Sequence, residues 1–301
     1  MFTDGKAEIV SISAKPRDIG EIVSLLEREM LIGGDLFLLP EACLGLDQNT
    51  LVVRTDGPEA AQISALAAKY RAYVVFPVFR EGGRTGRLNS SLLFGRDGEL
   101  ICAYDKLFPF WGEYDMSPPV DPGKSVCVAD TDFGRVGLAV CFDANFTPVF
   151  KGLAEAGARL VLWSSAYSGG TSLKAHAINH NYMVITSTLV PDCVVYDING
   201  DEIFYRSGEG DEVVVCRHSV DLDRCVFHED YNVGKIEKLL ADRPGEIEIE
   251  SWLKREKFIT VRSLKDGVSV RALAAEYGIE ELPAYKLRSE RAIDEMRGFK
   301  I

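Results

Sequence analysis

The segment "VGLAVCFDANFTPVF", residues 136–150, joins two kinds of structure around one thiol. The apolar run 136–140 predicts a buried strand, and Thr147-Pro148 is typical of the first turn of a helix. Cys141 lies between them, where the strand ends and the chain turns. A cysteine at such a turn is held rigidly beside the amide groups of a helix N-terminus, which lower the cost of thiolate formation. The segment therefore predicts a reactive cysteine at a strand-to-helix turn.

Two further strand-like runs end in side chains of complementary chemistry. "DLFLLPE" ends in Glu41, and "LICAYDK" ends in Lys106. Open α/β folds place their sites at the carboxyl ends of strands, so these groups are expected to meet Cys141 there. The thiol would attack an electrophilic carbon, the carboxylate would take its proton, and the ammonium and the backbone N–H of Phe142 would stabilise the oxyanion. Each residue alone is more typical of a buried cysteine or a solvated strand end, so the prediction depends on all three together.

The pattern of strands and helices predicts an α/β fold. Up to about residue 80 the order is β-α-β-α-β, and Asp18 and Glu21 are spaced as a capping box at the first helix. Hairpin turns are indicated by "RDG" at 96–98, "DFG" at 132–134 and "NG" at 199–200. Helices alternating with long strands and hairpins favour two sheets sandwiched by helices. The last 70 residues or so have the pattern of a mainly helical, polar-faced arm.

Composition restricts the classes of function. The 301 residues carry a formal net charge of −12, which argues against a general affinity for nucleic acid or anionic membranes. Seven cysteines, an odd number with no CxxC pair, favour a reducing compartment over a disulfide framework. The first residues lack the sections of a signal peptide, and no apolar run approaches the ~18 residues that cross a bilayer. We therefore expect a cytoplasmic protein.

Three motifs together resemble the nitrilase superfamily, the carbon–nitrogen hydrolases with a Glu-Lys-Cys triad. They are "LFLLPEACLG" around Glu41, "YDKLFPF" around Lys106 and "GLAVCFDANFTPVFKGLAEAGARLVLWSSA" around Cys141, and the resemblance extends over about residues 7–230. It implies a four-layer α-β-β-α sandwich over a domain 1–228, with a C-terminal helical arm over 229–301. It also implies no metal or organic cofactor, and a homodimer or larger homo-oligomer.

The resemblance also implies a role for each site residue. Cys141 would be the nucleophile, Glu41 the general base and Lys106 the group that stabilises the tetrahedral intermediate. Glu113 in "FWGEYD" matches a further glutamate found in many members, which would orient Lys106 or assist proton transfer. The predicted pocket-lining residues are Trp111, Phe142, Trp163, Ser164, Ser165 and Tyr167.

The residues after the nucleophile bear on the substrate. Cys141-Phe142-Asp143 resembles the amidase and carbamoylase branch more than the Cys-Trp-Glu of true nitrilases. We therefore expect hydrolysis of a small linear amide or N-carbamoyl compound through a thioester, with release of ammonia or amine. A nitrilase acting on a small nitrile is the alternative.

Two other features suggest different functions. His176 and His180 are spaced to share a helix face, but Ala177 occupies the position where a zinc protease has its glutamate, so no metal site is expected. "GVSVRALAAEYGIEELPAY" resembles a helix-turn-helix segment, which raises the alternative of a DNA-binding regulator. Residues 267–301 contain six basic and six acidic side chains, so no positive face stands out. The favoured expectation is an arm that packs on the body or across a dimer.

Overall fold

Two six-stranded sheets form the main body of the protein. The computed structural model describes residues 5–299. The first sheet has the order β12-β1-β2-β3-β4-β5 and contains β1 (Lys6–Ser13), β2 (Leu36–Leu38), β3 (Tyr73–Arg80), β4 (Leu88–Phe94), β5 (Leu100–Asp105) and β12 (Val214–Asp221). The second has the order β11-β10-β9-β8-β7-β6 and contains β6 (Cys127–Thr131), β7 (Gly134–Val140), β8 (Leu160–Ser165), β9 (Met183–Thr188), β10 (Asp192–Tyr196) and β11 (Glu202–Ser207).

Each sheet contains three parallel strands followed by two antiparallel strands, and this order is the same in both sheets. β1, β2 and β3 are parallel, and β4 and β5 add antiparallel; likewise β7, β8 and β9 are parallel, and β10 and β11 add antiparallel. The predicted hairpin turns are confirmed between β4 and β5 and between β10 and β11. Gly98 and Gly200 occupy the left-handed region there, with φ of 84° and 80°. Because parallel strands of one sheet end at the same edge, the carboxyl ends of β2 and β7 each bring a loop to that edge of their sheet.

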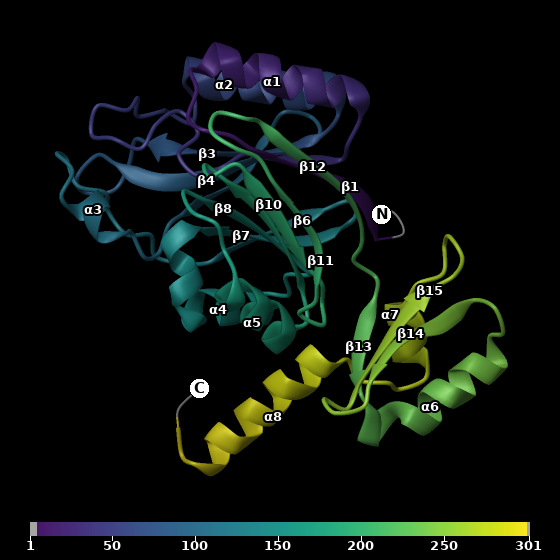
Figure 1. Cartoon of the computed structure of the whole chain (residues 1–301). Coiled ribbons are helices and arrows are strands. Elements are labelled where there is room, and N and C mark those ends of the chain that lie inside the picture. Colours follow the sequence, from purple (N-terminus) through teal and green to yellow (C-terminus); the bar gives the residue numbers. More distant parts are fainter. Residues whose placement is uncertain (1–4, 300–301) are drawn as a thin grey trace. The chain divides into compact units, whose positions relative to one another are not determined.

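Helices cover the outer face of each sheet (Figure 1). α1 (Ile19–Ile32) and α2 (Pro58–Tyr70) pack on the first sheet, and their apolar faces share one core with β1 to β4. α4 (Thr147–Glu155) and α5 (Thr171–His180) pack on the second sheet around Trp163 and Phe150. The capping box at Asp18 and Glu21 is present. The predicted α-β-β-α order of layers is confirmed.

Hydroxyl groups connect the two sheets across their facing sides. Ser187 Oγ donates to the Ile12 carbonyl at 2.7 Å, and Ser164 Oγ donates to the Leu39 carbonyl at 2.8 Å. These serines come from the second sheet, and their acceptors lie on or just after strands of the first. Because buried hydroxyl groups are costly unless bonded, the bonds fix the lateral position of one sheet over the other.

The C-terminal residues form a compact unit of their own. This unit comprises residues 221–299 with the short segments 5–6 and 132–134, and the body comprises 7–131 and 135–220. It contains β13 (Cys225–His228), α6 (Glu229–Asp242), β14 (Ile247–Leu253), β15 (Phe258–Ser263), α7 (Val270–Glu276) and α8 (Leu282–Met296).

The C-terminal unit differs from the mainly helical arm that the sequence predicted. β13, β15 and β14 form an antiparallel sheet with its own hydrophobic core, and β13 precedes the predicted boundary at residue 229. The prediction missed β14 and β15 because both strands are short and only partly buried, and Lys257, with φ of 62°, makes the turn between them without a glycine.

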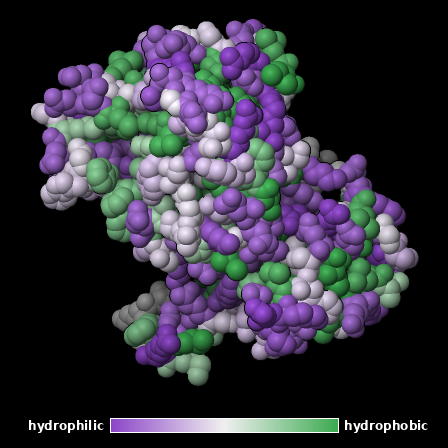
Figure 2. Space-filling view, in the orientation of Figure 1, coloured by the Kyte–Doolittle hydropathy of each residue, from purple (hydrophilic) through white to green (hydrophobic). Residues whose placement is uncertain are grey.

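Within the described residues, no helix combines the length and the hydrophobicity that crossing a bilayer would require. On the face of the molecule shown in Figure 2, hydrophilic and hydrophobic side chains are intermixed.

Candidate active site

Cys141 occupies a strained turn directly after β7. It begins the short 3-10 helix η1 (Cys141–Asn145) with φ of 47°, a left-handed conformation that costs a non-glycine residue roughly 1–2 kcal/mol. The indole N–H of Trp163 donates to the Cys141 carbonyl at 3.1 Å and holds the turn from behind. The thiol residue is 7% exposed. Strain retained at a nearly buried thiol is typical of a functional site.

Glu41 lies just beyond the end of a strand, and Lys106 directly follows one and is also fixed by backbone hydrogen bonds. Glu41 follows β2, and the next residue, Ala42, is also left-handed, with φ of 43°. Lys106 follows β5, where its N–H donates to the Asn89 carbonyl and its carbonyl accepts from Gly123, both at 2.8 Å. Both charged side chains are 1% exposed. The side chains therefore enter the protein interior from defined anchor points.

Four side chains form a closed ring of charged hydrogen bonds. Lys106 Nζ lies 2.7 Å from Glu41 Oε1 and 2.7 Å from Glu113 Oε2. Asn89 Nδ2 donates to the same two residues, to Glu41 Oε1 at 2.8 Å and to Glu113 Oε1 at 2.7 Å. One ammonium and one amide thus bridge two buried carboxylates, and each bond fixes the others.

Glu113 is buried, although it lies between exposed residues. It lies in α3 (Trp111–Tyr114), and its Oε2 also accepts from the backbone N–H of Phe110 at 2.6 Å. The same oxygen forms a 2.7 Å ion pair with Lys106 Nζ, the residue that Glu113 is expected to orient.

The Cys141 thiol lies against Glu41. Burial and, after it, the Glu41 carboxylate raise the pKa of Cys141 to about 12, against the opposite effect of Lys106 and of the Ala166 backbone amide. Glu41 Oε1 carries both hydrogen bonds from the ring, whereas the buried Oε2 meets no donor at hydrogen-bonding geometry within residues 5–299. One carboxylate oxygen is therefore held in place and the other is open to a proton.

The pKa of Cys141 corrects one expectation. Lys106 and a backbone amide do favour the thiolate, as the sequence suggested, but burial and Glu41 outweigh them. For Lys106, burial acts to lower the pKa, and Glu41, the Cys141 thiolate and Glu113 together raise it above its ordinary value. The resting site therefore contains a neutral thiol beside a permanently charged ammonium.

Three of the predicted pocket-lining residues lie at or near the surface beside the ring. Tyr167 is 38% exposed, and burial, followed by the charge of Cys141, raises the pKa of its phenol. Phe142 contacts Phe110 edge-on with ring centroids 5.6 Å apart, which links the Cys141 turn to the Glu113 loop. Trp111 is exposed and contacts Tyr114. The predicted role of these three residues in lining a pocket stays a prediction.

The other three predicted pocket residues have packing roles in the structure. Trp163, Ser164 and Ser165 are completely buried. Trp163 supports the Cys141 carbonyl, Ser164 bonds the Leu39 carbonyl, and Ser165 Oγ accepts from the Tyr167 N–H at 3.0 Å. Their strand, β8, lies next to β7 in the sheet, so these side chains support the residues that carry the chemistry rather than a ligand.

Of the histidine pair on α5, His176 is buried and His180 is half-buried. His176 Nε2 lies 3.0 Å from the Ala144 carbonyl, its ring stacks on Phe150, and burial lowers its pKa. Within residues 5–299 no group of His, Cys, Asp and Glu side chains is arranged to hold a metal ion.

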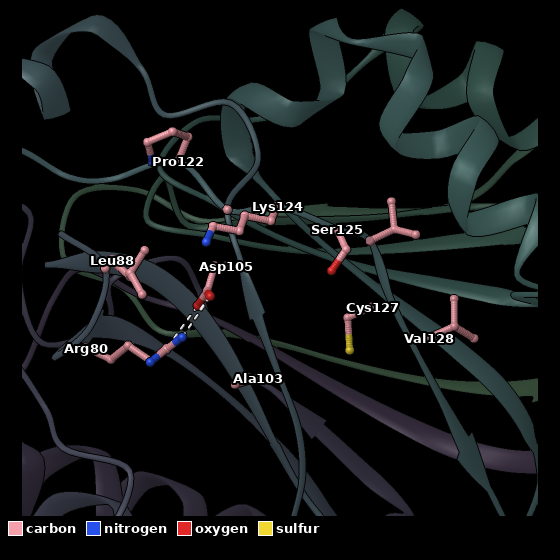
Figure 3. A pocket seen from close by; sticks show the side chains of 12 residues that line it. Arg80, Leu88, Ala103, Asp105, Pro122, Lys124, Ser125, Cys127 and Val128 are labelled. Atoms are coloured by element: carbon pink, nitrogen blue, oxygen red, sulfur yellow. Dashed lines mark hydrogen bonds and ion pairs between the residues drawn. The ribbon is translucent and has the colours of Figure 1, made fainter.

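A separate cavity of about 490 Å³ borders the Arg80–Asp105 ion pair and Cys127, and none of the ring residues lines it (Figure 3).

Two residues of this site, Asn89 and Asp143, were not predicted from the sequence as site residues. Asn89 bridges both glutamates, and Asp143 bonds the segment around Lys106. A polar residue within the apolar strand "LNSSLLF" was the available signal for Asn89. Its role depends on the pairing of β4 with β5, which composition does not reveal.

Comparison with known proteins places the chain in a family. The model of the family described as "Carbon-nitrogen hydrolase" matches residues 13–217, so the chain belongs to the carbon–nitrogen hydrolase family. A deaminated glutathione amidase from Yersinia enterocolitica is 30% identical over 152 residues, 45% of this chain and 53% of that protein. An ω-amidase from Bos taurus is 25% identical over 52% of this chain and 60% of that protein. The chain thus matches a little over half of each relative's length.

Solved structures share the fold. An amidase from Nesterenkonia sp., in a mutant showing covalent addition of the acetamide moiety of fluoroacetamide at the active-site cysteine, superposes with a TM-score of 0.63 at 18% identity, over 73% of this chain and 91% of that one. A branch 10 member of the nitrilase superfamily from Saccharomyces cerevisiae gives 0.62 at 18% identity, over 79% and 94%.

Proposed function

We propose that this protein is a cysteine-dependent amidase that hydrolyses a carbon–nitrogen bond of a small linear amide or N-carbamoyl compound. The observation that carries the proposal is the asymmetry of Glu41. Its Oε1 is held by Lys106 and Asn89, while Oε2 accepts no hydrogen bond within residues 5–299 and lies with the carboxylate beside the Cys141 thiol. A fixed base with one open oxygen next to a neutral thiol suits general-base-assisted attack.

The reaction proceeds in two halves. The Cys141 sulfur attacks the amide carbonyl as its proton passes to Glu41, and Lys106 stabilises the oxyanion of the tetrahedral adduct, together with the Phe142 backbone N–H. Collapse returns the proton from Glu41 to the leaving nitrogen, which departs as ammonia or amine and leaves a thioester. Water then attacks the thioester carbonyl as Glu41 takes one of its protons. Collapse of the second adduct breaks the C–S bond and releases the carboxylic acid, and Glu41 returns the proton to the sulfur, which restores the thiol.

The relatives support the substrate class. The curated proteins that match this chain include a deaminated glutathione amidase, a formamidase and ω-amidases. Phe142, Trp111 and Tyr167 offer aromatic surface and one hydroxyl near the thiol, which suits a small uncharged group better than an anionic one.

The test is a substrate panel of aliphatic amides, N-carbamoyl amino acids and nitriles, assayed for ammonia and followed by intact-mass spectrometry of the protein. We expect ammonia from amides or carbamoyl compounds and an acyl adduct on the wild-type chain. Cys141→Ala should give neither. Release from nitriles alone would favour the nitrilase alternative, and equal activity of wild type and Cys141→Ala would reject a cysteine mechanism.

A further inference from the structure

A buried carboxylate joins the segment that carries Lys106 to the turn that carries Cys141. Asp143 lies two residues after Cys141 in η1 and is completely buried. Its Oδ2 accepts from the Tyr104 hydroxyl at 2.6 Å and from the Val140 N–H at 3.0 Å. Its Oδ1 accepts from the Phe108 N–H at 3.0 Å. Tyr104 and Phe108 flank Lys106 in sequence, and Val140 immediately precedes Cys141.

These contacts span the two sheets. Tyr104 lies on β5 of the first sheet, and Val140 ends β7 of the second. The Tyr104 hydroxyl also accepts from the Leu107 N–H at 3.3 Å, so the lysine segment is held on both sides. Beside the carboxylate, Phe108 stacks on Phe146 with ring centroids 3.8 Å apart. One acidic side chain thus closes the sandwich at the point where the thiol and the ammonium enter the site.

The cost of this carboxylate indicates that it does more than fill space. No Lys, Arg or His within residues 5–299 forms an ion pair with Asp143, and burial raises its pKa to about 6 against the hydrogen bonds it accepts and the more distant charge of Lys106. A buried carboxylate without an ion pair is maintained only where its donors are well placed. Capping η1 would require only the Val140 bond, whereas Asp143 also accepts two donors from the lysine segment.

We propose that Asp143 is a positioning residue that sets the distance between Lys106 and Cys141 through its bonds to Tyr104 and Phe108. This inference rests on the proposed amidase function. Orientation errors of about 1 Å lower catalytic rates by about 100-fold. The ammonium must meet an oxyanion formed on the atom that the thiol attacks, so loosening this connection should lower kcat more than it raises KM.

Asp143→Asn is the informative substitution because it keeps the shape and removes the pattern of acceptors. The carboxylate accepts N–H donors on both oxygens, and an amide has only one acceptor oxygen, so its NH2 group must face the N–H of either Val140 or Phe108. Tyr104→Phe removes a single donor and leaves both backbone bonds. It therefore tests the connection even if Asp143→Asn fails to fold.

The experiment measures kcat and KM on the best amide of the panel for both variants, for the double variant and for two controls. We expect kcat to fall about 10- to 100-fold in Asp143→Asn and about 5-fold in Tyr104→Phe, with KM within about 3-fold. The double variant should be no slower than Asp143→Asn, because both substitutions break one connection. Tyr182→Phe and Asp35→Asn should retain wild-type kcat. Tyr182 is also a buried tyrosine, and its hydroxyl donates to the Phe150 carbonyl. Asp35 also accepts a backbone N–H, that of Glu8, but it precedes β2, whereas Glu41 follows that strand.

The outcomes separate this inference from the proposed function. Wild-type protein without activity on any member of the panel would reject the amidase proposal. Active wild type with unchanged kcat in Tyr104→Phe and Asp143→Asn would overturn the positioning role alone. Independent, multiplicative losses in the double variant, or losses confined to thermal stability, would reduce Asp143 to a structural cap and also overturn it.

Discussion

Asn89→Asp is a sharp test of the ring because it replaces one atom. In the wild type, Nδ2 of the buried Asn89 donates to Glu41 Oε1 at 2.8 Å and to Glu113 Oε1 at 2.7 Å. The substitution puts an oxygen where this nitrogen lies. If ionised, the introduced carboxylate would repel each glutamate by about 6 kcal/mol at 2.8 Å and an effective dielectric constant of about 20. Lys106 compensates for roughly one of these two repulsions.

One uncompensated repulsion of this size raises the pKa of the introduced carboxyl by about 4 units, to about 8. At pH 7 it is therefore protonated and donates one hydrogen bond where asparagine donated two. A hydrogen bond to a charged group contributes about 1.5–3 kcal/mol, which corresponds to a loss of about 10- to 150-fold in rate. Above pH 8 the carboxyl ionises inside the ring, and activity should fall further.

Stability should follow the same titration. The folded-state pKa of the introduced carboxyl lies above its unfolded value of about 3.9, so the stability of the variant relative to wild type is greatest below pH 4 and declines as the pH rises towards 8. Urea unfolding at pH 5, 7 and 9 measures this decline, and ammonia release at pH 7 and 9 measures the rate. Asn89→Ala, which loses both donors and adds no charge, should be slower than wild type without the added pH dependence. Wild-type turnover of Asn89→Asp at both pH values would refute the bridging role of Asn89.

Three further predictions concern the thiol and its base. Cys141→Ala should abolish ammonia release yet unfold at nearly the wild-type urea concentration; residual turnover above a few per cent would contradict its role as nucleophile. Glu41→Gln should lower the pKa of Cys141, because the carboxylate raises it, while also lowering kcat at least 100-fold. The pH profile of iodoacetamide alkylation measures the first effect, and an unchanged profile would argue against contact between the two groups. Cys141→Gly should be more stable than Cys141→Ala by about 1 kcal/mol because the turn has a φ of 47°, and the reverse order in urea would show that the turn is not strained.

The three reactive strand ends were predictable because each interrupts an apolar run. Glu41 and Cys141 follow apolar runs that are buried, so a charged or nucleophilic side chain at the end is conspicuous. Lys106 follows β5, whose first two residues are exposed, and its signal was the motif around it. Glu113 could be predicted only from the resemblance to a family, since its loop has no regular pattern. The burial of Lys106 beside Glu41 depends on how the strands of the first sheet pair, which the sequence does not specify.

The remaining features depend on long-range register. Asn89 reaches both glutamates because β4 lies between β3 and β5, and no local pattern specifies that neighbour relationship. Asp143 was noted only as part of a motif, whereas its partners lie 35 and 39 residues earlier in the chain. The strands of the C-terminal unit were missed for a different reason: in a short segment such as "IEIESWL" only the first four residues alternate between apolar and charged, which is too little to separate a strand from a helix.

The electrostatics of the site favour one order of proton transfer. Two carboxylates and one ammonium share a nearly closed space, so the ring already has an excess of negative charge before the thiol ionises. A stable thiolate would add a second uncompensated charge, which is why burial and Glu41 raise the pKa of Cys141 to about 12. Transfer of the thiol proton to Glu41 during attack avoids this, because the new negative charge forms on the substrate oxygen, next to Lys106. The burial that makes a resting thiolate costly thus favours a mechanism in which sulfur loses its proton only as it bonds to carbon.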